Sequence, residues 1–277
     1  MSLSVILLLL SGLCYAAAFL FHYLSFSEVK AIGHRPAFTL MRIGFLIATL
    51  YFGAEAIDHG FFLPVVNFSQ AMAFFAWSLG FVYLVLIVKA QTDSFGLILS
   101  PILLMLTAAA YLAKRHFGDH DTVKPFLLDP YFIVHIVSAF FAYASFTLSF
   151  AAGILYLIQH HELKLKRAGT FYHKLPSLEE LEKLIYQPML WGASLLLTTV
   201  VIGIVWSKTA FGEFWIFDPK TILTGVTVAL YSVILYLRYG ASLHGKRGAM
   251  LSFLAFAVVI FSFLGTRFIH GSHNYLR

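Results

Sequence analysis

The stretch LSVILLLLSGLCYAAAFLFHYL occupies residues 3–24 and contains no Asp, Glu, Lys or Arg. A helix needs roughly 20 apolar residues to cross the hydrocarbon core of a bilayer, which is about 30 Å thick. Seven more segments of suitable length follow at 37–57, 64–88, 95–113, 131–158, 185–207, 221–239 and 249–269. The sequence therefore predicts an all-α fold, a polytopic membrane protein with about eight transmembrane helices.

The composition supports a single transmembrane domain over residues 1–277. Apolar residues make up 60% of the chain and charged residues only 12%, whereas soluble domains carry about 25% charged residues. The net charge of +6 is spread over short loops, which excludes nucleic acid as a partner. The single cysteine, Cys14, excludes an internal disulfide or a CxxC pair. The first segment has no basic residues before it and no cleavage site after it, so we expect a retained helix.

The distribution of basic residues predicts an orientation. If both termini lie on the outer face, twelve of the nineteen Lys and Arg residues fall on the inner side and seven on the outer side. Cytoplasmic loops carry the excess of positive charge in most membrane proteins. We therefore expect both termini on the outer face.

The longest inner loop, 159–184, contains a helix start signal. Ser177-Leu178-Glu179-Glu180 is a capping box, in which the Ser and the second Glu satisfy each other's backbone N–H groups. Apolar residues at Leu178, Leu181, Leu184 and Ile185 recur at helical spacing. The sequence predicts a short amphipathic helix at the inner surface that runs into the sixth span.

Twelve histidines are many for so apolar a chain, and an ionisable group at membrane depth suggests a function. Most have a simpler explanation as solvated loop residues, namely His34, His160, His161, His173 and His244. An outer loop with His116, Asp119, His120 and Asp121 could hold a weakly bound metal ion, although it lacks recognised ligand spacing. His22, inside the first span, is a buried packing residue or a ligand.

His135 differs from these because it lies four residues inside the fifth span, beside the small residues Ser138, Ala139, Ala142 and Ala144 that permit close approach. We therefore expect it to be either buried or a ligand. His270 and His273 follow the eighth span and return to the same outer face under the expected topology. Imidazoles from distant parts of the chain can therefore meet there.

The outer loop 208–220 contains four aromatic residues, Phe211, Phe214, Trp215 and Phe217, followed by Asp218, Pro219 and Lys220. An aromatic belt at the membrane interface would explain the aromatics but not the polar end. There Asp218 suits a helix N-cap and Pro219 the first helical position. We interpret the loop as a rigid shelf for a large flat ligand, and haem is such a ligand whose iron takes axial His.

The loop resembles the tryptophan-rich WWD signature of the CcsA/CcmC/HemX-type cytochrome c assembly proteins, which reads approximately WGxYWxWDPKE. Two Trp of that signature are Phe here, and its final Glu is Thr221. Residues 175–181 resemble the family's inner-loop signature. His59, Pro64, Asn67 and Trp77 fall at the spacing of its segment HFPxSNxYE followed by Trp, with Gln70 in the Glu position.

The resemblance implies a haem site. Its outward-facing ligands would be His135 and His273, with His270 as a rival for the second position, and the shelf would comprise Phe211, Phe214, Trp215, Phe217 and Asp218. Synthases of the family carry a further histidine where this chain has Tyr236. The chain therefore looks closer to the HemX and YpjD-like branch.

Three functions remain as hypotheses. The first is haem handling in cytochrome c biogenesis, in a bacterial cytoplasmic membrane, with haem b held transiently for an apocytochrome c and with a second membrane subunit as partner. Such a component need not contain a catalytic acid or base. The second is a membrane regulator or sensor of haem biosynthesis that acts through the inner loop. The third is an ion transporter that uses Glu55, Asp58, His59, Asn67 and Gln70.

Overall fold

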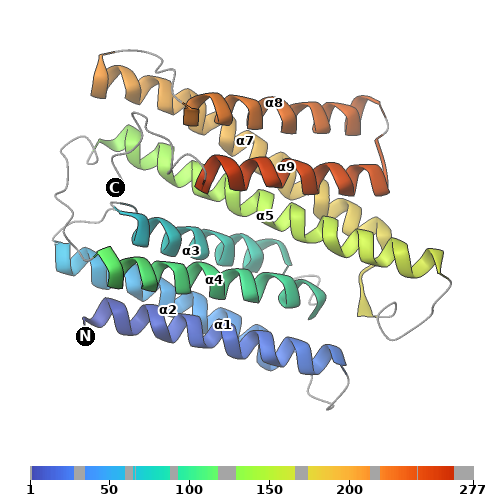
Figure 1. Cartoon of the computed structure of the whole chain (residues 1–277), viewed down its shortest axis with the longest axis horizontal. Helices are drawn as coiled ribbons and strands as arrows, with labels where there is room; N and C mark the ends of the chain where they lie inside the picture. The colour runs from blue at the N-terminus through green and yellow to red at the C-terminus, as the bar shows by residue number, and fades with distance from the viewer. Residues whose placement is uncertain are drawn as a thin grey trace. The chain divides into compact units, whose positions relative to one another are not determined.

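The computed structural model describes residues 2–27, 35–59, 65, 67–87, 93–117, 129–165, 174–212, 219–241 and 243–264. These ranges contain helices and no strand, in the order α1 (Leu3–Ser27), α2 (Arg35–His59), α3 (Phe68–Ile87), α4 (Asp93–Phe117), α5 (Pro130–Lys164), α7 (Leu178–Phe211), α8 (Pro219–Gly240) and α9 (Lys246–Leu264) (Figure 1). All eight are long and apolar enough to cross a membrane. The expected all-α polytopic fold is confirmed.

The helices form two compact units. Unit 1 comprises Met1–Thr122 and Gly169–Pro176 and therefore contains α1 to α4. Unit 2 comprises Val123–Ala168 and Ser177–Arg277 and contains α5, α7, α8 and α9. That the two units make one transmembrane domain over residues 1–277 stays a prediction.

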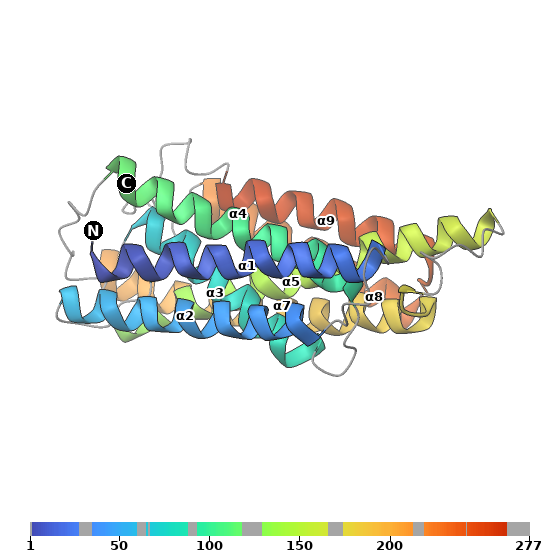
Figure 2. The same cartoon turned by 90° about the horizontal axis from the view of Figure 1, so that it is seen from below.

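In unit 1, α1 packs against α2 and α4, and α3 packs against α4. Figure 2 shows α1 and α2 running side by side along their length. A glycine permits this close packing, because a Cβ on Gly44 of α2 would lie 2.8 Å from the Tyr15 ring of α1. Lys174, although distant in sequence, donates hydrogen bonds to the Ser25 and Phe26 carbonyls at the end of α1.

In unit 2, α5 lies at the centre and packs against α7 and α9. The small residues predicted to permit close approach, Ser138, Ala139, Ala142 and Ala144, are all buried. A Cβ on Gly192 of α7 would lie 3.1 Å from the Ala142 carbonyl. The Phe146 ring of α5 stacks on Tyr231 of α8 with 3.7 Å between ring centroids.

The helix start predicted at Ser177 is present. The Ser177 hydroxyl accepts a hydrogen bond from the Glu180 N–H at 3.2 Å, and the Ser177 N–H donates to the Glu180 carboxylate at 3.1 Å. As expected, the helix runs into the sixth span, because α7 continues for 34 residues from Leu178 to Phe211. At 1.5 Å per residue it measures about 50 Å, more than the hydrocarbon core. Leu181 and Ile185 are buried in the helix packing.

Candidate functional site

His135 is held near the start of α5 by a well-defined helix cap. Asp129 is the N-cap, its carboxylate accepts a hydrogen bond from the Tyr131 N–H at 2.8 Å, and Pro130 begins the helix. The second oxygen of Asp129 accepts a hydrogen bond from the Thr209 hydroxyl at 3.3 Å. The start of α5 and the end of α7 therefore meet, as expected for antiparallel neighbours.

The His135 ring is half-buried and oriented by the backbone of α7. Its Nδ1 lies 2.9 Å from the carbonyl oxygen of Thr199. A carbonyl can only accept, so Nδ1 carries the hydrogen. In the neutral ring, Nε2 is then the nitrogen with the lone pair. Metal-binding histidines have this arrangement, in which the other ring N–H donates to a carbonyl and fixes the tautomer.

Three residues of one face of α7 surround this ring, at positions i, i+4 and i+7. Thr199 accepts from it, and a Cβ on Gly203 would lie 2.8 Å from its Cε1 and Nδ1 atoms. Trp206 stacks on it, with 6.1 Å between centroids and 27° between planes. None of the three was predicted from the sequence. The spacing of Thr199, Gly203 and Trp206 places them on one face of a helix, and this was the signal that could have indicated a binding face for a ring.

The aromatic loop begins where α7 ends. Gly212 adopts φ = 80° in the left-handed region, and its N–H donates to the Lys208 carbonyl at 3.1 Å. The Lys208 ammonium in turn donates to the Gly212 carbonyl at 3.0 Å. A residue without a Cβ adopts this φ at no steric cost. The chain thus leaves α7 at a defined position.

The remaining predicted site residues lie at or beyond the limits of the described chain. Phe211 is the last residue of α7, and α8 begins at Pro219 as the sequence predicts. Residues outside the described ranges are Phe214, Trp215, Phe217, Asp218, His270 and His273. Their roles in the shelf and as ligands stay predictions.

His22 belongs to unit 1 and is fully buried. Its ring meets Phe38 of α2 edge-on, with 5.3 Å between centroids. A Cβ on Gly96 of α4 would overlap the His22 ring, so the glycine provides the space for it. Packing between three helices accounts for this histidine.

Tyr236 of α8 stands at the position where synthases of the family carry a further histidine, and its side chain is 72% exposed.

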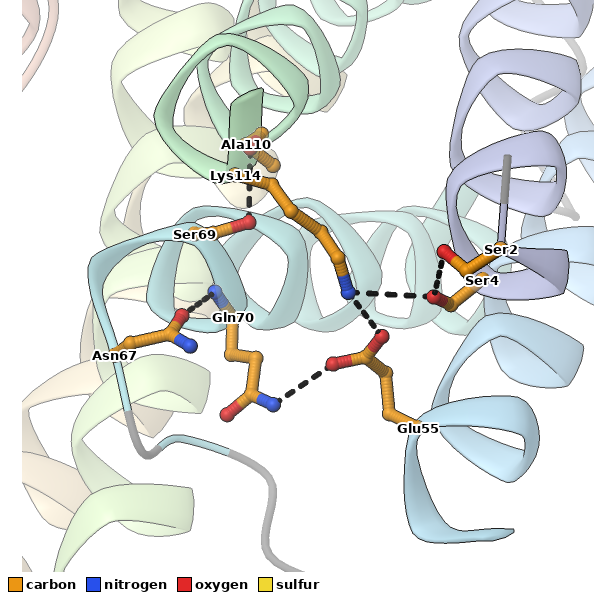
Figure 3. Close-up of polar contacts among 8 residues, drawn as sticks. All are labelled: Ser2, Ser4, Glu55, Asn67, Ser69, Gln70, Ala110 and Lys114. Carbon is orange, nitrogen blue, oxygen red and sulfur yellow. Dashed lines mark hydrogen bonds and ion pairs between the residues drawn. The ribbon is translucent and has the colours of Figure 1, made fainter. Parts of the chain in front are cut away.

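Four buried side chains from four helices form a polar cluster in unit 1, namely Ser4, Glu55, Gln70 and Lys114 (Figure 3). The Lys114 ammonium lies 2.5 Å from Glu55 Oε1 and donates to the Ser4 hydroxyl at 3.2 Å. The Gln70 amide donates to Glu55 Oε2 at 2.9 Å. The start of α1, the end of α2, the start of α3 and the end of α4 are therefore joined at one end of the unit.

This cluster bears on the transporter hypothesis. Glu55 and Gln70 face one another and Lys114, and Asn67 caps α3 by accepting from the Gln70 N–H at 2.9 Å. Asp58 is exposed and the His59 side chain lies outside the described part of the chain. The contacts fasten helices together, which favours a structural role.

The metal site considered for the outer loop between α4 and α5 stays untested. The described residues contain no group of three His, Cys, Asp or Glu that could hold a metal ion. Of the outer-loop candidates, His116 is exposed on α4, whereas Asp119, His120 and Asp121 lie outside the described ranges.

Trp77 donates to the Thr49 hydroxyl at 2.9 Å and stacks on Phe74. It therefore packs α3 against α2.

Comparisons with known proteins agree with the resemblance of the loops. The family model described as "Cytochrome C assembly protein" matches residues 65–273, which include α5 and α7 with His135 and its neighbours. The chain is 29% identical to Protein HemX of Brevibacillus brevis over 91% of both chains. It is 27% identical to Protein HemX of Bacillus subtilis over 90% of both. Cytochrome c biogenesis protein CcsA of Guillardia theta is 28% identical, covering 82% of this chain and 81% of that protein. The chain therefore belongs to the family of cytochrome c assembly proteins.

Proposed function

We propose that this protein holds haem during cytochrome c assembly, with His135 as one axial ligand of the iron and His273 as the other. The observation that carries the proposal is the hydrogen bond between His135 Nδ1 and the Thr199 carbonyl. Because Nδ1 donates to that carbonyl, Nε2 would be the ligating nitrogen, and the contact orients the ring before a metal arrives.

The described residues fit an axial ligand of haem. Orienting a ring costs conformational entropy, and at His135 the folded protein has already met that cost through Thr199, Gly203 and Trp206. Ser138 supports the arrangement, because its hydroxyl lies 2.8 Å from the Thr199 hydroxyl. Haem iron takes histidine as a ligand in many proteins, and burial and hydrogen bonding set its properties.

The aromatic loop completes the proposed site. It leaves α7 at Gly212 and enters α8 at Pro219, so both of its ends are attached to helices. Phe211, Phe214, Trp215, Phe217 and Asp218 would form the shelf on which the flat face of haem rests. His135 lies on α5, whose N-cap is hydrogen-bonded to the last turns of α7.

Bound haem would supply a redox-active iron and the vinyl groups to which the thiols of an apocytochrome add. The residues of this chain would bind and orient the group, and no acid or base from this chain is required. We propose haem b held transiently, an apocytochrome c and a second membrane subunit as partners, and a location in a bacterial cytoplasmic membrane with both termini on the outer face. The family membership supports this proposal, and so do the eight helices of the described chain that are long and apolar enough to cross a membrane.

Absorption spectra of the detergent-purified protein, oxidised and reduced, test the proposal. A spectrum of six-coordinate haem that is lost in the His135→Ala and His273→Ala variants is the expected result. His161→Ala is the matched control, because His161 is exposed near the end of α5 and should leave the spectrum unchanged. The His270→Ala variant, compared with His273→Ala, shows which of the two histidines is the second ligand. A wild-type protein that takes up no added haem would contradict the proposal.

A different measurement distinguishes the regulator hypothesis from a role in cytochrome c assembly. Haem-stained cytochrome c in cells that carry each variant reports assembly directly. Assembly requires His135, whereas regulation through the inner loop requires residues between α5 and α7. If His135→Ala removes haem binding but leaves cytochrome c levels unchanged, the protein senses haem and does not deliver it.

A further inference from the structure

An open surface pocket of about 450 Å³ lies at the connection between α8 and α9. This volume lies within the range of ligand pockets, roughly 300–1,000 Å³. Residues from the end of α8, the connection and the start of α9 line it: Leu237, Ala241, Leu243, His244, Lys246 and Arg247. Nothing in the proposed haem site uses this pocket.

The wall of the pocket is braced from α7 and α8. Glu182 of α7 accepts hydrogen bonds from the Arg238 guanidinium at 2.8 Å and from the Gly245 N–H at 3.2 Å. The Leu243 carbonyl accepts from the Tyr186 hydroxyl at 3.3 Å and from Arg238 at 3.2 Å. The guanidinium also lies over the Tyr186 ring, 4.5 Å from its centroid. The pocket is therefore preformed.

The charge of the lining is positive. Lys246 and Arg247 are exposed in the first turn of α9, which contains no acidic residue. The nearby carboxylate of Glu182 is paired with Arg238. Cations at the start of a helix are opposed by the helix dipole, whereas an anion is favoured there. A ligand that complements the charge of this pocket is therefore an anion.

The position of the pocket points to a lipid phosphate as the anion. Both α8 and α9 are long and apolar enough to span a membrane, so we expect their short connection at the level of the lipid head groups, whichever face it occupies. Arg binds phosphate through paired hydrogen bonds and Lys binds it as a point charge, and Leu237 and Leu243 add apolar lining. We propose that this pocket binds the phosphate of an anionic phospholipid head group.

Native mass spectrometry of the detergent-purified full-length chain tests this assignment, with phosphatidylglycerol and phosphatidylcholine as probes. The wild-type protein is expected to bind phosphatidylglycerol at least about tenfold more tightly than phosphatidylcholine. In K246Q/R247Q its affinity for phosphatidylglycerol should fall about 25-fold, or about fivefold for each charge removed. Sodium phosphate as a competitor should displace the lipid poorly.

The matched control is K164Q/K183Q, which removes two exposed charges from the same end of unit 2 and outside the pocket. Thermal unfolding of each variant checks that it is folded. Equal losses of affinity in the two double variants would mean general attraction to a basic surface and would overturn the assignment. Equal binding of the two lipids, or full displacement by sodium phosphate, would overturn it as well.

Discussion

Lys114 and Glu55 form a buried ion pair with 2.5 Å between Nζ and Oε1, and their side chains are only 8% and 3% exposed. The two residues are separated by 59 positions in sequence and join the ends of α4 and α2. Removing one partner of a buried pair leaves a charge without compensation, which costs about 3–5 kcal/mol. Breaking the pair is therefore expected to destabilise unit 1.

Lys114→Met is expected to lower the free energy of unfolding by about 3–5 kcal/mol, measured by chemical unfolding in detergent. The double variant E55Q/K114M should recover most of this loss, because it leaves neither charge buried alone. Lys183→Met is the control, since Lys183 and Glu179 form an exposed i,i+4 pair and little change is expected. Equal effects of Lys114→Met and E55Q/K114M would contradict the role of the pair.

Gly203→Ala is expected to disturb His135, because the added Cβ would lie 2.8 Å from the Cε1 and Nδ1 atoms of the ring. Displacing the ring from the Thr199 carbonyl removes the contact that orients the proposed ligand. Loss of such a contact lowers metal affinity by about 10- to 100-fold. Haem titration followed by absorption spectroscopy measures this change.

Gly225→Ala serves as the control for that measurement. Gly225 lies in α8 of the same unit, and a Cβ there meets no atom within 4 Å. This substitution should leave haem affinity unchanged and stabilise the helix by up to about 1 kcal/mol. A Gly203→Ala protein with wild-type haem affinity would show that the orientation of His135 does not matter for binding.

Gly212→Ala tests the junction between α7 and the aromatic loop. The left-handed φ of 80° costs an alanine about 1–2 kcal/mol, so the unfolding free energy should fall by that amount. Gly212→Asn should cost less, because Asn adopts this conformation more readily. Thermal unfolding compares the two variants. If the loop supports haem from this junction, the alanine variant should also weaken haem binding more than the asparagine variant.

Gly96→Ala tests the interpretation of His22 as a packing residue. The new Cβ would overlap the His22 ring, and overpacking of this kind costs about 1–3 kcal/mol. The double variant H22A/G96A should be more stable than Gly96→Ala alone, because the ring is gone. His22→Ala by itself should leave the haem spectrum intact. Loss of that spectrum would instead identify His22 as a ligand.

Several elements could be predicted from the sequence because local patterns encode them. The spans follow from the number of consecutive apolar residues, although α7 begins at Leu178, ahead of the predicted span at 185–207. The prediction of a capping box at Ser177 was correct because its two partners, Ser177 and Glu180, are only three residues apart in sequence. His135 stood out because an ionisable residue inside an apolar segment is rare.

Local patterns along the chain were thus enough to predict the all-α membrane fold, the helix start at Ser177 and His135 as a candidate ligand. Which side chains meet depends on how the helices pack. Thr199, which orients His135, lies 64 positions away, and Lys114 pairs with Glu55 across 59. Hydrophobic periodicity indicates which face of a helix is apolar. Many different pairings of such helices would bury a similar apolar surface area. The choice among them depends on close contacts such as those at Gly203 and Gly96, which form only when two helices have packed.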